Sequence, residues 1–342
     1  MSNKNHHRVL AALESELWAI TPEGLEQIIA IAQGCGDLEA VAAKLGGRLP
    51  NTRNVQNRDG VAVIPVIGPI FRYANVFTEI SGATSIQTLA TDFSAALADP
   101  AIKAIVLEVD SPGGMAAGVS EFAAMVRAGT AKKPVVAYVS NFGASAGYWI
   151  PSAAQKIVVA DTAMLGSIGM VLRVGITKDS GTVEIVSSQS PFKRVDASTD
   201  DGRDRIQATV DAMAAVFVES VARYRGVSVD HVLFNFGQGS LLVGRDAVQA
   251  GLADQLGSLE STIKQLQSLA SNGGNPPIPS TQHSTPQAPS AMLEEQHLRA
   301  EWARNPHLQN EFGEFSTFLA YKKAEATGKV RVQGGTAGRV GR

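Results

Sequence analysis

Between residues 60 and 270 the chain repeats one pattern, in which a short apolar run ends at glycine or proline-glycine and a helical pattern follows. The clearest apolar runs are residues 61–70, 101–110, 134–140 and 156–161. Continuous apolar runs of this length suit strands that are buried on both faces of a sheet. Strands that alternate with helices favour a parallel sheet with right-handed crossovers. The repeat therefore predicts an α/β fold whose strand ends carry glycine-rich turns.

Changes in composition divide the chain into four segments. Residues 1–59 carry a helical apolar spacing and a polar linker, and residues 60–270 hold the strand–turn–helix repeats. Residues 271–290 are rich in Pro, Ser, Gly, Asn and Gln, which predicts a flexible linker. Residues 291–342 return to a helical pattern, with aromatic residues on a charged background, and end in a Gly-rich basic tail that we expect to be disordered.

Local signals place further elements along these segments. Apolar side chains recur at helical spacing over residues 8–35, and Thr21 followed by Pro22 is typical of a helix N-terminus. The remaining expected elements are helices at 84–98, 116–129 and 203–225, a strand at 183–188, and a helix, a turn and a short strand across 244–258.

Composition excludes several classes of protein. Apolar residues make up 44% of the 342 residues, which is enough for a sizeable core, and a net charge of −2 gives no electrostatic reason to expect a nucleic-acid partner. The single cysteine, Cys35, can form neither an intrachain disulfide nor a zinc cluster. The longest apolar run, residues 60–71, is too short and too broken for a membrane helix, and the N-terminus lacks the apolar core of a secretory signal. We therefore expect a cytoplasmic protein.

Two glycine-rich turns, DSPGG and GASAG, follow buried strands that are neighbours in the sequence. Ligands of parallel sheets bind at the carboxyl ends of strands, so these turns are expected to meet there. Either Gly113 or Gly114 could donate an N–H to a developing oxyanion, and Ala146 could donate a second one. Ser145 stands at the start of a helix between small residues, which suits a nucleophile. On its own, a small-residue cluster such as GASAG after a strand more often indicates tight packing of a helix on a sheet; its pairing with DSPGG favours a catalytic site.

A nucleophilic serine needs a base, and the residues alone leave that base open. His231 is the one histidine within residues 60–270, and its adjacent Asp230 is its only obvious orienting carboxylate. A lysine in an apolar setting loses its charge more readily and can act as a base near neutral pH. Lys178 and Lys193 are the lysine candidates, and their spacing along the chain separates them only slightly.

The order of five motifs carries a family resemblance. LEVDSPGG, GASAGYWI, ADTAMLGSIGMV, FKRVDAST and GRDAVQAGLADQLG, taken together, closely resemble the signal peptide peptidase A family of serine peptidases. The N-terminal LWAITPEGLEQIIAIA, with no membrane anchor expected before it, is most similar to the phage branch of capsid or head maturation proteases. The resemblance covers about residues 60–270. It implies the spiral of strand–strand–helix units found in the ClpP and crotonase superfamily, with an N-terminal helical segment and a linker-joined, scaffold-like C-terminal extension.

The same resemblance implies a Ser/Lys dyad and assigns its members in this chain. Ser145 takes the position of the nucleophile and Lys193 that of the general base. Gly114 falls on the oxyanion-hole glycine, with Ala146 supplying the second N–H. Ser167 falls on the serine that positions the lysine amine, and a helix N-cap is an equally good explanation of that serine.

Two departures from the family pattern affect this assignment. The phage branch often has a lysine followed by Val-Asp-Gly-Asn-Pro, whereas this chain has Lys193-Arg194-Val195-Asp196-Ala197, with one residue inserted. The change alters the register around the base while leaving the identity of the nearest lysine intact. Ala146 also replaces a commoner glycine, which still leaves a backbone N–H.

The expected function is that of an endopeptidase that forms an acyl-enzyme and cleaves phage capsid or scaffold proteins, and itself, during prohead maturation in the host cytoplasm. The alternatives are a cytosolic bacterial peptidase of the same family, a crotonase-like acyl-CoA enzyme, which would need catalytic carboxylates, and a non-catalytic capsid assembly protein. We expect a homo-oligomeric ring, no nucleic-acid or membrane partner, no cofactor and no metal. The small residues around Ser145 favour small apolar side chains before the cleaved bond.

Overall fold

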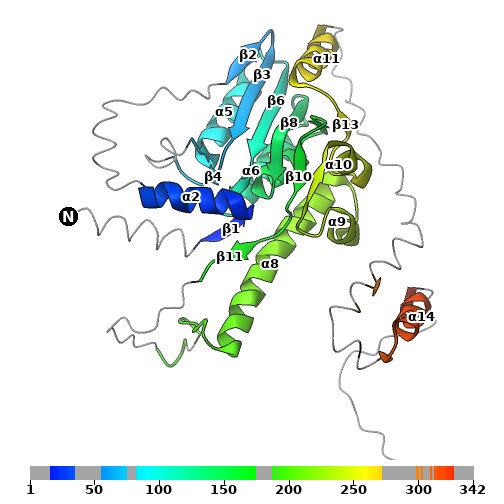
Figure 1. The fold of residues 1–342 in the computed structure, drawn as a ribbon. Coiled ribbons are helices and arrows are strands. Elements are labelled where there is room, and N and C mark those ends of the chain that lie inside the picture. Colours follow the sequence, from blue (N-terminus) through cyan, green and yellow to red (C-terminus); the bar gives the residue numbers. More distant parts are fainter. Residues whose placement is uncertain are drawn as a thin grey trace, which may run out of the picture. The chain divides into compact units, whose positions relative to one another are not determined.

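The computed structural model describes two parts of the chain that are compact in themselves, residues 1–281 and residues 282–342 (Figure 1). The residues that it describes are 16–34, 55–74, 82–174, 187–190, 192–271, 298–299, 302, 309 and 312–326. The predicted domain boundaries at 59/60, 270/271 and 290/291 stay predictions.

A large, mostly parallel sheet forms the centre of the first part. Its strand order is β12-β10-β8-β6-β3-β2, and β9 pairs with β8 on one side and β13 on the other. The long strand β8 pairs with β9 through its first half and with β10 through its last three residues, in parallel both times. The bounds are β2 Gln56–Arg58, β3 Val61–Ile67, β6 Ala104–Ser111, β8 Val135–Ala144, β9 Lys156–Val159, β10 Met164–Gly166, β12 Leu241–Val243 and β13 Gln255–Leu256.

A second, smaller sheet has the order β11-β1-β7-β4-β5. Its bounds are β1 Leu17–Ile20, β4 Ile70–Phe71, β5 Thr84–Ser85, β7 Gly113–Met115 and β11 Val171–Leu172. The chain leaves β3 of the large sheet, adds β4 to the small sheet and then forms a helix; β6, β7 and the helix after them repeat this path. This succession confirms the predicted spiral of strand–strand–helix units.

Helices cover both faces of the large sheet (Figure 1). On one face, α5 and α6 are locked by the edge-on contact of Phe93 with Phe122, and α7 and α8 by the stacking of Trp149 on Phe217. On the other face, α11 packs Ile263 against a separate cluster of buried strand residues. The helix bounds are α2 Pro22–Gly34, α5 Ile86–Ala98, α6 Val119–Gly129, α7 Ala146–Ser152, α8 Asp200–Arg225, α9 Val229–Asn235, α10 Gly244–Ala250 and α11 Leu259–Ser271.

The N-terminal prediction is confirmed at the helix cap and wrong before it. Thr21 accepts a hydrogen bond from the Gly24 N–H (3.2 Å) through its Oγ1, and Pro22 opens α2. Residues 17–20, predicted as helical, form β1 instead, because their backbone pairs with strands that lie far away in the sequence. The predicted strand 183–188 lies mostly outside the described residues; residues 187–188 are a coil and a turn.

The second part of the chain contains α14, Phe315–Ala326, and a cluster of aromatic rings around it. Phe318 is almost fully buried there, and the guanidinium of Arg299 lies over the ring of Phe315. No helix within the described ranges of the whole chain combines the length and apolar character needed to cross a bilayer.

Candidate active site

Ser145 stands between the end of β8 and the start of α7 in a strained backbone conformation. Its φ is 56° and its ψ is −121°, a combination that non-glycine residues rarely adopt. The Ser145 N–H donates to the Gly166 carbonyl (2.8 Å), and its own carbonyl accepts from the N–H groups of Tyr148 and Trp149. The side chain is 1% exposed. A serine held in a strained backbone at a sharp strand-to-helix turn is a candidate nucleophile.

Close contact between α7 and the end of β6 explains why small residues surround Ser145. A Cβ at Gly147 would lie 2.6 Å from the Ser111 carbonyl oxygen, so no side chain fits there. The Ser111 hydroxyl is fully buried; it donates to the Gly68 carbonyl (2.7 Å) and accepts from the Gly113 N–H (3.2 Å). Ser111, which sequence reasoning treated only as part of a turn, thus holds the glycine pair in place.

The glycine pair lies directly beside the serine. Gly113 has a φ of 103°, and a Cβ on it would lie 3.0 Å from the Ser145 Cβ. A Cβ on Gly114 would overlap the backbone of Ile70 in β4. The two motifs predicted to meet at the strand ends therefore do meet. Since Ala146 is the first residue of α7, its N–H belongs to the turn of a helix that has no intrahelical acceptors.

Ser167 lies one residue beyond the carbonyl that binds Ser145. It is partly buried, has a φ of 51°, and its N–H donates to the Ser240 carbonyl (2.9 Å). The residues that follow it, 168–174, contain no helix, so the alternative explanation as a helix N-cap is wrong. Its predicted action on the lysine amine stays a prediction.

Lys193 lies elsewhere, in an exposed turn before α8. Its N–H donates to the Ser190 carbonyl (3.0 Å), and the neighbouring Phe192 ring lies under the guanidinium of Arg205, 3.6 Å from the ring centre. We call residues 192–216, the turn and the outer part of α8, the arm; it projects beyond the two sheets in Figure 1. At about 1.5 Å per residue, roughly 27 Å of helix separate Thr199, the N-cap of α8, from Phe217, which stacks near the serine. Among the described residues, the contacts do not bring Lys193 to Ser145.

The other two candidate bases are His231 and Lys178. The His231 ring in α9 lies with its Nε2 3.2 Å from the Ala250 carbonyl and edge-on to Phe236, so it is engaged in packing α9 against α10. Lys178 lies outside the described residues.

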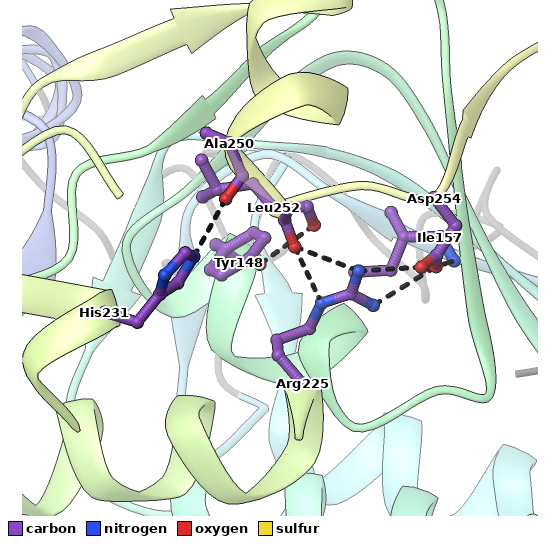
Figure 2. Close-up of polar contacts among 8 residues, drawn as sticks. Tyr148, Ile157, Arg225, His231, Ala250, Leu252 and Asp254 are labelled. Carbon is purple, nitrogen blue, oxygen red and sulfur yellow. Dashed lines mark hydrogen bonds and ion pairs between the residues drawn. The ribbon is translucent and has the colours of Figure 1, made fainter. Parts of the chain in front are cut away.

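A buried polar network joins α7 and α8 to the turn after α10, and it was not predicted from the sequence (Figure 2). Arg225, the last residue of α8, forms an ion pair with Asp254 (2.8 Å) in which both side chains are about 5% exposed or less, and it also donates twice to the Gly251 carbonyl. Asp254 accepts from the Ile157 N–H (2.6 Å) in β9. This single ion pair links a helix, a turn and a strand.

Tyr148, one turn after Ser145, joins the same region. Its hydroxyl donates to the Leu252 carbonyl (2.9 Å), and burial raises the pKa of Tyr148 well above its ordinary value. The phenol is therefore neutral across the physiological range and acts as a hydrogen-bond donor. The turn within the motif GRDAVQAGLADQLG has a structural role: its Gly251 and Leu252 carbonyls accept hydrogen bonds from Arg225 of α8 and Tyr148 of α7.

Comparison with known proteins finds one family model and several relatives that are similar to the chain. Residues 127–272 match the model of peptidase family S49. This part of the chain, which includes Ser145, is similar to that family. The chain is 33% identical over 212 residues to capsid assembly protease C of Escherichia phage lambda, covering 60% of this chain and 48% of that protein. It is 31% identical over 220 residues to the head-tail preconnector protein GP5 of Enterobacteria phage P21, covering 62% of this chain and 43% of that protein.

Among solved structures, the chain is similar to the 1510-N membrane-bound stomatin-specific protease, with 18% identity, a TM-score of 0.40, and coverage of 66% of this chain and 90% of that one. The chain spans about half the length of the two phage proteins or slightly less. The family match and the phage relatives confirm the resemblance that the five motifs predicted.

Proposed function

We propose that the chain is a serine endopeptidase with Ser145 as nucleophile and Lys193 as general base. The observation that carries the proposal is the meeting of a strained, buried Ser145 with the Gly113–Gly114 pair. The match of residues 127–272, which include Ser145, to peptidase family S49 supports it. Protease-named relatives support the same activity.

The proposed reaction uses these groups in two steps. The Ser145 hydroxyl adds to the carbonyl carbon of the substrate, and its proton passes to the neutral amine of Lys193. The N–H groups of Gly114 and Ala146 stabilise the oxyanion of the tetrahedral intermediate. The lysine then gives its proton to the leaving amine as the peptide bond breaks, which leaves an acyl-enzyme. A water molecule then gives a proton to the same lysine and adds to the ester, which forms a second tetrahedral intermediate. This intermediate collapses, the lysine returns the proton to the Ser145 oxygen, and the acid product is released.

The position of Lys193 on the arm sets a condition on this mechanism. The dyad forms when the arm bends toward its own Ser145, or when the arm of a neighbouring copy reaches it. A ring of copies, which we propose as the active assembly, would present each arm to the next subunit. Ser167, beside Gly166, would then receive and position the amine.

The proposed substrates are capsid or scaffold proteins and the chain itself, in the prohead within the host cytoplasm. This part of the proposal is supported by the name of the phage lambda relative, a capsid assembly protease. The proposed domain layout is a peptidase domain at 60–270, a linker at 271–290 that is a site of self-cleavage, and a scaffold-like extension at 291–342. The proposal includes no cofactor, no metal, and no nucleic-acid or membrane partner.

The experiment is mass spectrometry of the purified full chain after prolonged incubation. The wild type should lose its C-terminal extension by cleavage within residues 271–290, and Ser145→Ala and Lys193→Ala should stay intact. Ser94→Ala and Lys264→Ala, at exposed positions of α5 and α11, serve as matched controls and should be cleaved like the wild type. Cleavage that persists in Ser145→Ala would refute the proposal.

Mixing the two inactive variants tests how the base arrives. Recovery of cleavage on mixing Ser145→Ala with Lys193→Ala would mean that one copy lends its lysine to another copy's serine. An inactive mixture, with active wild type at the same concentration, would assign both residues to one chain.

A further inference from the structure

The N-terminal strand β1 fills the gap between two strands of the small sheet. Leu17–Ile20 runs antiparallel to β7 on one side and to β11 on the other. Its partners are the strand that carries the Gly113–Gly114 pair and the strand that follows the Ser167 turn. An extended peptide that adds itself between two strand edges in this way is a known mode of peptide recognition.

The register of this pairing aims one carbonyl at the predicted oxyanion hole. Ala19 lies opposite Gly114. The flanking bonds, from the Thr21 N–H to the Pro112 carbonyl (2.9 Å) and from the Ala116 N–H to the Leu17 carbonyl (3.0 Å), belong to an antiparallel ladder with alternating pairs. In that alternation Ala19 and Gly114 form the hydrogen-bonded pair, so the Gly114 N–H points at the Ala19 carbonyl.

The same strand covers the nucleophile. A Cβ at Gly113 would overlap the Ala19 carbonyl oxygen and would lie 2.9 Å from the Ile20 Cα and 3.0 Å from the Ser145 Cβ. The β1 backbone and Ser145 therefore both crowd the position that a Gly113 side chain would occupy, which places Ala19 close to the serine. Ala19 is 0% exposed and Ser145 is 1% exposed, so a second peptide has no access to the serine while β1 is in place.

The side chains of β1 alternate between two environments. Ala19 belongs to the main buried cluster that includes Ala146 of α7, and β1 contacts α7 directly. Trp18 and Ile20 point to the other side, where the Trp18 ring meets Phe71 edge-on at 6.1 Å between ring centres. The position whose carbonyl faces Gly114 thus takes a methyl group, in agreement with the small residue expected before a cleaved bond.

We propose that Leu17–Ile20 is a substrate mimic bound in cis. It occupies the cleft between β7 and β11 in which a protein substrate would bind as an extended antiparallel strand, with a small residue in the position of Ala19. The proposal rests on the proposed function, because it takes Gly114 and Ser145 as parts of a peptidase site. The chain holds its own site closed until β1 leaves.

The chain beyond Ala19 explains why such a strand acts as an inhibitor. The Thr21 N–H is bonded to Pro112, and Thr21 caps α2, whose Leu25 and Ile28 are buried with Ile20 and Phe71. If Ser145 attacked the Ala19 carbonyl, the amine of Ile20 would be released but held in place. It would attack the acyl-enzyme and re-form the peptide bond, restoring the Ser145 hydroxyl. Net hydrolysis at this bond is therefore slow.

The test uses the full chain with Ala19→Pro, which removes an N–H from the middle of the strand. The substrate is Leu-Trp-Ala with a C-terminal coumarin amide, which repeats residues 17–19. Hydrolysis by Ala19→Pro should be about tenfold faster than by the wild type, since the strand loses a ladder hydrogen bond and its preferred geometry. Glu26→Ala, an exposed change in α2, should match the wild type. Trp18→Ala, which removes the contact with Phe71, is a second opening variant and should shift the rate in the same direction.

Two further readouts separate the possible failures. Labelling of Ser145 by a fluorophosphonate reports the nucleophile without a peptide, and thermal unfolding reports whether each variant is folded. Wild type that is labelled and hydrolyses the peptide as fast as folded Ala19→Pro and Trp18→Ala would overturn the masking and leave the peptidase intact. Folded variants that neither hydrolyse nor become labelled would overturn both proposals. Wild type found cut between Ala19 and Ile20 would overturn the masking alone.

Discussion

The surroundings of Ser145 and the arm that carries Lys193 differ in burial and in how tightly they are packed. Around the serine, most neighbours are buried, the backbone is strained, and glycines allow main chains to touch. Along the arm, side chains are mostly exposed and the ion pairs lie on the surface of one helix. The fold thus holds Ser145 and the proposed oxyanion donors in place, whereas Lys193, the proposed base, would have to be brought to them. Under the proposed mechanism, folding prepares the serine, and assembly or movement of the arm supplies the base.

The largest expected effect is a loss of catalytic rate, and it should be the same for a substitution at the serine as for one at the lysine. Ser145→Ala and Lys193→Ala should each lower the rate of peptide hydrolysis by roughly 10⁴-fold, because a nucleophile and its base act as a unit. Stability should separate them: Lys193→Ala should leave the free energy of unfolding within about 0.5 kcal/mol of the wild type, as expected for an exposed side chain. Steady-state kinetics in the Ala19→Pro background and thermal unfolding measure the two quantities. A strongly destabilised Lys193→Ala would contradict the exposed arm.

The next effect contrasts a buried ion pair with an exposed one. Asp254→Ala leaves the Arg225 guanidinium buried without its carboxylate and should cost about 3–5 kcal/mol of stability. Asp201→Ala removes the partner of Arg205 on the arm, where the side chains are 38% and 74% exposed, and should cost about 0.5 kcal/mol or less. Denaturant unfolding of both variants measures the difference. Equal losses would mean that the arm is as firmly packed as the centre.

A third contrast compares two glycines with positive φ. Gly113→Ala forces a methyl group into the Ala19 carbonyl and should cost about 3 kcal/mol, together with loss of activity. Gly226→Ala, at the C-terminal cap of α8, meets open space and should cost only about 1 kcal/mol, the strain of its left-handed conformation. Chemical denaturation of the two variants checks this ratio. A mild Gly113→Ala would show that β1 can move aside at little cost.

Much of the central fold could be predicted from sequence because strands buried on both faces of a parallel sheet consist of continuous apolar residues. The strands β6 and β8 were predicted within a few residues for this reason, and so was the meeting of Gly113 with Ser145, because both turns end neighbouring strands. Strand β1 was missed since Leu17 and Ile20 also fit a helical spacing, and its strand conformation depends on partners more than 90 residues away.

The buried ion pair could not be predicted for a different reason. Arg and Asp residues are usually exposed, and nothing local marks Arg225 or Asp254 as partners across 29 residues. Only the packing of α8 against the turn after α10 brings them together. The place of Lys193 relative to Ser145 has the same character, because it depends on the length and direction of α8 and not on the residues around the lysine.

A smaller effect concerns the pH dependence of the buried centre. Since burial raises the pKa of Tyr148, the folded state holds this proton more tightly than the unfolded state, whose phenol titrates near 10. The stability that this difference contributes is fully present below about pH 10, and it is lost as the pH rises toward the raised pKa of the folded state. Wild type should therefore begin to lose stability as the pH rises past about 10 and keep losing it above that pH, more steeply than Tyr148→Phe. The variant itself should cost about 1 kcal/mol at neutral pH through the lost bond to Leu252.

The smallest effect returns to the arm. Phe192 is 60% exposed and its ring is covered by the Arg205 guanidinium, a contact between a cation and an aromatic face that should contribute about 0.5 kcal/mol at an exposed site. Phe192→Ala should therefore barely change the unfolding temperature. It should nonetheless slow peptide hydrolysis measurably, because it loosens the turn that holds the adjacent Lys193, and Phe192→Tyr, which keeps the ring, should restore the rate. If Phe192→Ala changed neither the unfolding temperature nor the rate of hydrolysis, the turn around Phe192 would not help to position Lys193. The part of the arm that brings the lysine to the serine would then lie in α8 itself.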